Sequence, residues 1–415
     1  MNKSDTELIG NEYIAENFNS DQFQEISNHL LKENVSILIP DGDSDFALPV
    51  IECLSRIPKI KIVVLSHNRW SIARFTKHNI VYRYSELAET EAGWIDALIS
   101  LMSELEIDMV LPVDQYTIGN LTCHKTLFHQ TDRRISVPPV SSFEIATDKW
   151  LQAELMMNNH LSTPYTILID SLKKIEAGLS EISYPVLTKP RKSSNGEGII
   201  LWNDKANLLR YLREEAQLSE IVIQSYVKGG GVDCSVLCRD GVILAYTIQE
   251  SVLPGNRPFG PAGSIRFAQN EEVLSLAEGL IKSLSWSGMA HIDMIYDEDE
   301  KKYKIIEINP RYWASLLGSL SVGVNFPYLA CLDHLGVQFL KPPYRSEPYL
   351  SGRALFRIFL KNPFSSSARS VGFKKTSLKY ILSDPLPTLV KMLRKIYRLS
   401  SKKLSSSQSV PITDH

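Results

Sequence analysis

The sequence predicts an α/β amino-terminal domain, an α+β central domain and a basic, helical carboxy-terminal extension. Strand patterns alternate with helical patterns up to about residue 140, apolar runs then come in adjacent pairs, and the last part is rich in Lys, Arg and Ser. A chain of 415 residues is also too long for one compact core. We therefore expect a lead-in at 1–30, an α/β domain at 31–140, the central domain at 141–345, the extension at 346–400 and a disordered tail at 401–415.

In the amino-terminal domain, short apolar runs predict strands at 35–40, 61–65, 79–82 and 108–113. Apolar residues recur at helical spacing after the first run, and they are Ala47, Val50, Ile51 and Leu54. Residues 92–105 form a second helical pattern. Strands that alternate with helices across short connections are typical of a parallel sheet.

The central domain begins with two helical patterns, at 142–147 and 149–159. The apolar runs that follow are paired, first 184–189 with 198–202, then 221–226, 233–238 and 242–249 in succession. Because their connections are short, we expect antiparallel hairpins. One of these would turn through the glycine cluster Gly229 to Gly231.

Composition excludes several classes of protein. A net charge of −2 gives no reason to expect a nucleic-acid partner, and 44% apolar with 22% charged residues is ordinary for a globular protein. The chain starts without a basic, apolar leader and has no run of 18 apolar residues. An odd, scattered set of cysteines indicates reduced thiols in a cytoplasmic protein, and these are Cys53, Cys123, Cys234, Cys238 and Cys331.

The most informative segment is a pair of strands, GMAHIDM at 288–294 and YKIIEINPR at 303–311, joined by an acidic turn. Side chains alternate faces along a strand, so Glu307 and Asn309 share one face and Ile306 and Ile308 the other. If the strands pair, Asp293 joins Glu307 and Asn309 in a set of oxygen ligands that suits Mg²⁺. The alternative is a surface hairpin whose acids face water, and the apolar flanks argue against it.

Two further segments carry weaker signals. Lys189 ends an apolar strand and is followed by a small, flexible loop, KPRKSSNGEG, whose backbone would approach phosphate oxygens. A hairpin turn with an exposed lysine has the same pattern. The segment IVIQSYVKGGGVD at 221–233 runs from a buried strand into glycines and, taken alone, favours a plain hairpin.

Taken in this order, the three segments resemble the ATP-grasp superfamily over about residues 145–330, with the EINPR run as the most specific element. The preceding α/β region is similar to the domain that normally precedes an ATP-grasp fold. The resemblance implies nucleotide contacts from Lys149 and Lys189 and a phosphate-covering loop that includes Ser193, Ser194, Gly196 and Gly198. It also implies an adenine hinge and a ribose-binding acid, which are Gln224, Tyr226, Val227 and Asp233.

The resemblance further implies that Asp293, Glu307 and Asn309 hold Mg²⁺ or Mn²⁺, and that Arg311 steadies the γ-phosphate or an acyl phosphate. Two positions depart from the family pattern, because Gln224 stands where many members carry an acid and Asp293 where many carry Glu. Arg266 and Arg257 are additional candidates for a substrate carboxylate, with solvated loop arginines as the alternative. For His291, a packed core histidine is favoured over a base.

The function that the resemblance implies is an ATP-dependent ligase, which activates a carboxylate as an acyl phosphate and couples it to an amine. A kinase or carboxylase using the same nucleotide site is one rival. A non-catalytic nucleotide-binding regulator is another, and an ADP-release assay separates it from the enzymes. The expected partners are a small carboxylate and an amine, and an oligomer is neither required nor excluded.

The carboxy-terminal extension has eleven Lys or Arg and one acid, Asp384, between Lys361 and Lys403. Apolar residues recur there at helical spacing, and basic residues fill the remaining face. The first set is Leu386, Leu389, Val390, Leu393, Ile396 and Tyr397. Two interpretations of this basic amphipathic helix stay open, packing on its own domain and contact with a membrane surface or a protein partner.

Overall fold

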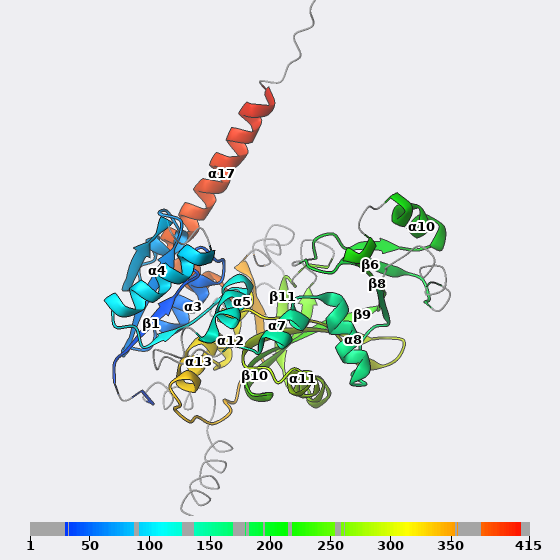
Figure 1. Cartoon of the computed structure of the whole chain (residues 1–415), viewed down its shortest axis with the longest axis horizontal. Helices are drawn as coiled ribbons and strands as arrows, with labels where there is room; N and C mark the ends of the chain where they lie inside the picture. The colour runs from blue at the N-terminus through cyan, green and yellow to red at the C-terminus, as the bar shows by residue number, and fades with distance from the viewer. Residues whose placement is uncertain are drawn as a thin grey trace, which may run out of the picture.

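A computed structural model shows three sheets with helices around them, and one long helix that leaves the body (Figure 1). The structure describes residues 30–31, 33–86, 91–126, 137–168, 179, 182–193, 196–214, 218–253, 259–260, 262–352, 355 and 375–407. Of the predicted site residues, Ser194 and Arg257 lie outside the described residues, as do nearly all of the predicted lead-in and the part of the tail from residue 408.

The amino-terminal sheet has the order β3-β2-β1-β4, and all its strands run parallel, which confirms the prediction. Its strands are β1 (Val35–Ile39), β2 (Ile60–Ser66), β3 (Ile80–Tyr84) and β4 (Met109–Val110), and its helices include α3 (Ala47–Leu54), α4 (Glu91–Glu104), α5 (Gln115–Cys123) and the short η1 (Ile72–Phe75). Strand β4 is shorter than predicted: Leu111 still donates to Leu38, but Pro112 has no N–H to continue the ladder.

The central sheet has the order β13-β12-β9-β10-β11-β14 and is antiparallel throughout. Its strands are β9 (Gly229–Arg239), β10 (Val242–Leu253), β11 (Ser264–Ala268), β12 (Gly288–Asp297), β13 (Lys302–Asn309) and β14 (Pro348–Leu350). Helices α7 (Val140–Ala146), α8 (Lys149–Asn158) and α11 (Glu271–Ser283) contribute to its apolar core. Strand β14 lies beyond residue 345, so the central sheet extends past the predicted domain boundary.

A third, antiparallel sheet has the order β5-β8-β6-β7. It contains β5 (Thr166–Leu168), β6 (Val186–Pro190), β7 (Ile200–Trp202) and β8 (Ile221–Ser225), with η3 (Leu218–Glu220) before β8 and α10 (Lys205–Glu214) beside β7. The hairpin of β6 and β7 was predicted correctly. The expected hairpin of β8 and β9 is wrong, because the two strands belong to different sheets and the glycines from Gly229 to Gly231 are part of β9 itself.

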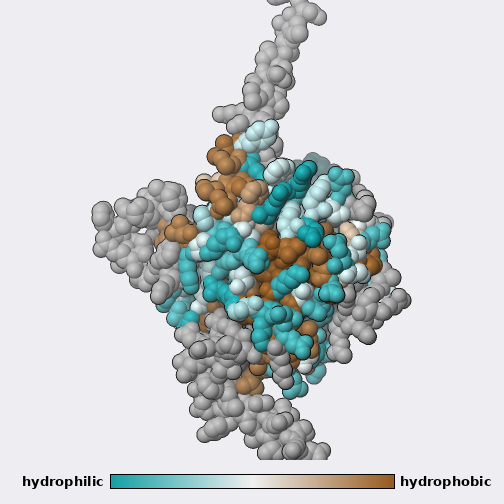
Figure 2. Space-filling model, turned by 90° about the vertical axis from the view of Figure 1, so that its left-hand side faces the viewer, coloured by the Kyte–Doolittle hydropathy of each residue, from teal (hydrophilic) through white to brown (hydrophobic). Residues whose placement is uncertain are grey.

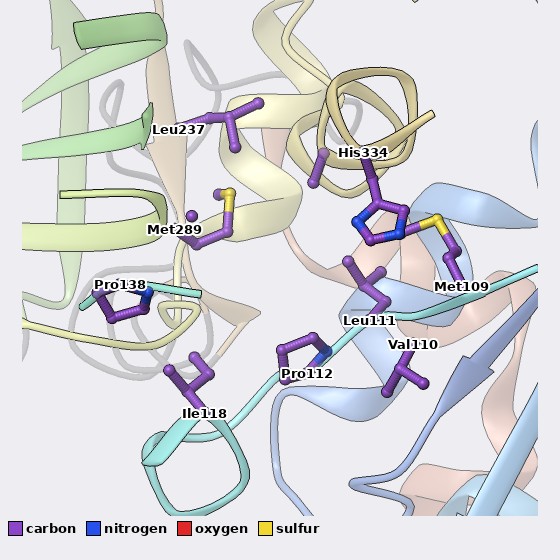
Figure 3. A pocket seen from close by; sticks show the side chains of 11 residues that line it. Met109, Val110, Leu111, Pro112, Ile118, Pro138, Leu237, Met289 and His334 are labelled. Carbon is purple, nitrogen blue, oxygen red and sulfur yellow. The ribbon is translucent and has the colours of Figure 1, made fainter. Parts of the chain in front are cut away.

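The amino-terminal domain and the central sheet share one core, contrary to the separate domains that the sequence suggested. Helices α12 (Leu316–Val322) and α13 (Phe326–His334) pack against α3, and one hydrophobic cluster joins Ile37 and Ile51 to Leu237 and Trp313. An apolar cavity of about 20 Å³ lies at this junction (Figure 3), where α13 meets the loop after β4. Its walls include Met109, Leu111, Pro112, Ile118, Leu237, Met289 and His334.

No single helix of the described residues is long and apolar enough to span a membrane. Helices α12 and α13 pass that test only as a pair, but they meet at 87° and their residues are mostly buried in the core. All five cysteines are free thiols, and Cys123 alone among them is exposed.

The chain ends in α16 (Leu378–Ser383) and α17 (Pro385–Ser407), and the latter projects from the body (Figure 1). The disordered tail was predicted from residue 401. The helix instead continues to Ser407, and residues 399–407 contain neither Gly nor Pro to stop it.

Asn325 ties α13 to the amino-terminal domain, and this contact yields a testable prediction. Its side chain is buried, accepts from the Tyr328 N–H at 3.3 Å and donates to the Cys53 carbonyl at 2.9 Å. Asn325→Ala removes the helix cap and leaves the Cys53 carbonyl without its donor, so the free energy of unfolding should fall by about 2–3 kcal/mol. Asn270→Ala, which removes the cap of α11 in a less buried place, should cost only about 1 kcal/mol. Equal losses in chemical denaturation would contradict this role.

Candidate active site

The β12–β13 hairpin places the predicted metal ligands together. Asp293 lies opposite Glu307, and His291 lies opposite Asn309. The Asn309 amide donates to Asp293 Oδ2 at 3.2 Å and to Glu307 Oε1 at 3.3 Å. The predicted convergence of these three side chains is therefore confirmed. The two carboxylates attract positive charge, and their oxygens suit a hard divalent cation. The Asn309 amide faces them with its N–H₂ group, while its Oδ1 accepts from Arg311, so the amide must turn over to offer its oxygen to a metal ion.

A register shift in this hairpin changes one prediction about its buried face. Asp293 pairs with Glu307, but Met294 pairs with Ile305, so Ile306 is an extra residue in β13. Ile305 and Ile308 are buried, whereas Ile306 is only partly buried. The bulge keeps Glu307 and Asn309 on the site's side of the sheet while the strand before it returns to the core.

A third carboxylate and an imidazole extend this group. Asp233 on β9 lies directly opposite Asp293 on β12. His291 Nε2 lies 3.3 Å from Asp293 Oδ1 and 3.8 Å from Asp233 Oδ2. These three side chains are close enough together to hold one metal ion. The resemblance assigned Asp233 to the ribose, but the structure places it among the metal-binding candidates, so a role for Asp233 in either contact stays a prediction.

Electrostatics reflect the crowding of acids. Burial raises the pKa of Asp233 to about 7. Burial, followed by repulsion from Asp233 and Glu307, raises the pKa of Asp293 well above its usual value. Burial and the neighbouring Arg311 lower the pKa of His291 to about 3, so its imidazole is neutral at physiological pH. A neutral imidazole beside two carboxylates can act as a metal ligand.

A buried hydrogen-bond network behind His291 was not found by sequence reasoning. Ser235 lies 2.9 Å from His291 Nδ1, and Gln249 Nε2 donates to Ser235 Oγ at 2.7 Å. Ser315 in turn donates to Gln249 Oε1, and His291 stacks on Trp313. The network fixes the ring so that Nε2 points at the carboxylates. Its only signal in the sequence is a polar residue at every second position of an otherwise apolar strand.

Two lysines lie near the carboxylates, one at the start of helix α8 and one on strand β6 of the third sheet. Lys149 opens α8, and its Nζ lies 3.8 Å from Glu307 Oε2 and 2.6 Å from the Ser193 carbonyl. Lys189 ends β6 and is buried, and burial lowers its pKa to about 8. Among the neighbouring charges, Glu307 has the largest effect on the pKa of Lys189, and it acts in the raising direction. Lys189 therefore lies close enough to Glu307 to be influenced by its charge.

Gln224 holds Lys189 in place. Its Oε1 accepts from Lys189 Nζ at 2.6 Å, and its Nε2 donates to Thr166 Oγ1 at 2.9 Å. In this structure the buried amide is therefore committed to the lysine, not presented as an adenine contact. Tyr226, also assigned to the adenine hinge, donates its backbone N–H to Pro185, and Val227 is nearly buried. Adenine contacts from these three residues stay predictions.

Arg191 is a second functional residue that the sequence reasoning missed. Its guanidinium forms an ion pair with Asp148, whose carboxylate also caps α8 by accepting from Trp150 at 2.9 Å. The Lys149 N–H donates to the Arg191 carbonyl at 3.1 Å. These contacts fasten the start of α8 to the end of β6, and so fix Lys149 beside Lys189.

The loop after β6 is built for close backbone approach at two glycines. Gly196 and Gly198 have φ of 73° and 74°, a conformation that favours glycine. A Cβ on Gly196 would lie 2.7 Å from the Phe259 carbonyl, and one on Gly198 would lie 2.6 Å from Pro190. Ser193 is described and partly buried, with its carbonyl on Lys149. The loop's role in covering phosphates stays a prediction.

The two arginines predicted to be catalytic lie in different surroundings. Arg311 Nη2 donates to Asn309 Oδ1 at 3.3 Å, which places its guanidinium beside the carboxylates. Arg266 pairs with Glu250 at 2.6 Å and is exposed. By strand register Glu250 lies opposite Val232, next to Asp233, so Arg266 points to the other face of the central sheet. The structure therefore does not bring Arg266 to the site.

The amino-terminal domain closes one side of this arrangement. The Phe46 ring, just after the loop at the end of β1, lies 5.1 Å from the Arg311 guanidinium. Tyr312 donates its N–H to the Val113 carbonyl at 3.2 Å, after β4. Both contacts come from the carboxyl ends of parallel strands, where ligands bind in open α/β sheets.

Comparison with known proteins agrees with this architecture. A family model described as "ATP-grasp domain" matches residues 146–315. The D-alanine–D-alanine ligase of Francisella tularensis subsp. novicida is 30% identical over 181 residues, which cover 41% of this chain and 58% of that protein. A carbamoyl phosphate synthase large chain section from Methanopyrus kandleri is 29% identical over 32% of this chain and 26% of its own length. The matches thus span less than two thirds of the length of these relatives.

Solved structures share the fold over more of the chain. N5-carboxyaminoimidazole synthetase from Staphylococcus aureus superimposes with a TM-score of 0.63 at 16% identity, over 81% of this chain and 88% of that chain. L-amino acid ligase from Bacillus licheniformis superimposes with a TM-score of 0.54 at 19% identity, over 76% of this chain and 78% of that chain. Since the matched family model spans the third sheet and the hairpin that carries Asp293 and Glu307, residues 146–315 of this chain form an ATP-grasp domain.

Proposed function

We propose that the protein is an ATP-dependent ligase that activates a carboxylate as an acyl phosphate and couples it to an amine. One observation carries the proposal. Asp293 and Glu307 are paired, Glu307 lies 3.8 Å from Lys149, and Asn309, which donates to both acids, accepts from Arg311. Acids for a divalent cation on one side and fixed cations for phosphate oxygens on the other are what phosphoryl transfer requires.

In this proposal Asp293, Glu307 and Asn309 hold Mg²⁺ or Mn²⁺, with Asp233 and His291 next to them. The metal would supply charge neutralisation at the outer phosphates. Lys149 and Lys189 bind phosphate oxygens, and the loop from Ser193 to Gly198 covers them. Lys189 is held by a neutral partner, the Gln224 amide, which orients it without cancelling its charge. Lys149 donates to the Ser193 carbonyl and also lies 3.8 Å from Glu307.

The substrate carboxylate attacks the γ-phosphorus of ATP, and ADP leaves with the electron pair of the broken P–O bond. Arg311 stabilises the charge that develops, because its guanidinium lies at the open end of the hairpin and is steadied by Asn309 and Phe46. The amine then attacks the acyl carbon and expels phosphate. Closure of the loop after β6 keeps water from the acyl phosphate.

The amine side of the reaction belongs, in this proposal, to the loops after β1 and β4. Asp41 is buried and accepts from the Val113 N–H at 2.7 Å, and Ser44 donates to Asp114 at 2.8 Å. These contacts join the two loops at the point where the strand order reverses between β1 and β4. The Phe46 contact places them next to Arg311, so an amine bound there would approach the acyl carbon.

The experiment that tests the proposal is an ADP-release screen with pairs of carboxylic acids and amines, amino acids first. Turnover that requires both an acid and an amine supports a ligase. Turnover with bicarbonate in place of an organic acid would indicate a carboxylase, and ADP binding without any turnover would indicate a regulator.

Glu307→Gln should reduce turnover by about a hundredfold or more, because it removes charge from the proposed metal site and keeps the shape. The apo-protein should be no less stable, since repulsion between Glu307 and Asp293 is relieved. Glu298→Gln, at the exposed turn of the same hairpin, is the matched control and should retain full activity. Turnover in Glu307→Gln equal to that of Glu298→Gln would rule out this metal assignment.

Gln224→Leu should raise the KM for ATP by about tenfold, because Lys189 loses the acceptor that orients it. The rate at saturating ATP should change less. Thr166→Val removes only the contact behind Gln224 and should have a smaller effect. A KM that is the same in all three proteins, measured with one acid and amine pair, would mean that Gln224 does not position the lysine.

The nucleotide products should be ADP and phosphate. The acids and Arg311 lie together, so charge is stabilised at the outer phosphates. Phosphorus NMR of a completed reaction identifies the products. The acid alone should also support slow scrambling of isotope from the β–γ bridge of ATP. Stoichiometric AMP and pyrophosphate would contradict both the mechanism and the use of this site.

A further inference from the structure

Helix α17 is attached to the body only through its first turns. Asp384, just before it, accepts from the Lys77 N–H at 3.1 Å and from the Thr76 hydroxyl. Lys391 pairs with Asp45, and the start of the helix packs against η1. Beyond this point the helix extends away from the other elements (Figure 1). The interpretation that the helix packs along its own domain is therefore wrong for most of its length.

The apolar side of α17 is left uncovered. Leu393 is 65% exposed and Tyr397 75% exposed, values that a packed helix face would not show. These residues recur three or four positions apart, so they form one continuous stripe. Figure 2 shows apolar side chains gathered on the lower part of the projecting helix. The exposed stripe consists of Leu386, Leu389, Leu393, Ile396 and Tyr397.

The opposite side of α17 is basic. Between Pro385 and Ser407 the sequence has six Lys or Arg and no Asp or Glu. At about 100° per residue, five of the six fall on the arc opposite the apolar stripe. Those five are Lys391, Arg394, Lys395, Arg398 and Lys402.

The positive charge of α17 indicates what covers its apolar stripe. A second copy of the chain could cover the apolar stripe, but it would bring six more cations alongside and no acid to pair with them. An anionic lipid surface offers both an apolar layer and negative charge. An amphipathic helix with Lys and Arg on one face and Leu, Ile and Tyr on the other is the form that lies in a membrane interface.

We propose that α17 binds an anionic lipid surface, with its apolar stripe at the boundary of headgroups and acyl chains and its basic residues beyond Lys391 against lipid phosphates. The helix is about 35 Å long, at about 1.5 Å per residue, so it can lie along the surface for several turns. The contacts of Asp384 and Lys391 then hold the amino-terminal domain close to the membrane. This goes beyond the proposed ligase activity and does not depend on it.

Flotation of the full-length protein with vesicles tests the proposal. Vesicles of phosphatidylcholine with an equal part of phosphatidylglycerol should bind the protein, and vesicles of phosphatidylcholine alone should bind it far less. Binding should weaken with added salt, because the basic residues act over about a Debye length. Binding to both vesicle types to the same extent would overturn the proposal, as would no binding to either.

Two double variants separate the two faces. Leu389→Gln with Leu393→Gln should weaken binding by about a hundredfold. Arg394→Gln with Lys395→Gln should weaken it by about twenty-five-fold, about fivefold for each charge. Matched controls make the same kinds of change on other exposed surfaces, Val242→Gln with Val252→Gln and Lys205→Gln with Arg210→Gln, and should bind as the parent does.

Sedimentation in the absence of vesicles tests the alternative that a second copy of the chain binds the apolar stripe. If the parent protein self-associates through α17, Leu389→Gln with Leu393→Gln will dissociate it. That result together with absent flotation would assign the stripe to a second copy and overturn the proposal. Thermal melts of all variants should match the parent, because the substituted residues are exposed, and a folded variant that binds normally despite both changes in a pair would also overturn it.

Discussion

The pairing of Asp293 with Glu307 across β12 and β13 is the constraint on which the rest of the site depends. Backbone hydrogen bonds hold the two carboxylates side by side, where they repel one another, and Asp233 on the next strand adds to the repulsion. Such a group stays fully ionised only beside positive charge. Lys149 and Arg311 supply some of it in the structure, and a divalent cation would supply more.

The surrounding residues position these cations without cancelling them. Arg191 forms an ion pair with Asp148, and this ion pair fixes the start of α8. Lys189 is matched with an amide in place of a carboxylate, so its charge remains for a ligand even though burial lowers its pKa to about 8. A site arranged in this way is preorganised to bind a polyanion, and the burial of its charged groups has a cost in free energy.

The shared core gives the site a rigid frame. Trp313 follows the EINPR run, stacks on His291 and packs edge-on against Phe326 at the start of α13. The same cluster includes the apolar residues of β1 and α3. The loops after β1 and β4 are therefore fixed relative to the hairpin, so the amino-terminal domain takes part in the site and is not a separate module on a linker.

The sequence by itself determined most of the strands of this protein and the most important of its candidate residues. Period-two and helical patterns located most strands within a few residues, together with helices α3, α4, α7, α8 and α17, but they did not locate α10, α11, α12 or α13. Alternation along two strands was enough to bring Asp293, Glu307 and Asn309 together, because that pairing is local. For strands that do not form a tight hairpin, tertiary structure alone decided which of them share a sheet. It separated β8 from β9 despite their short connection, and it turned Arg266 to the opposite face. Long-range pairing depends on how whole faces are buried, and neighbours in the sequence do not carry that information.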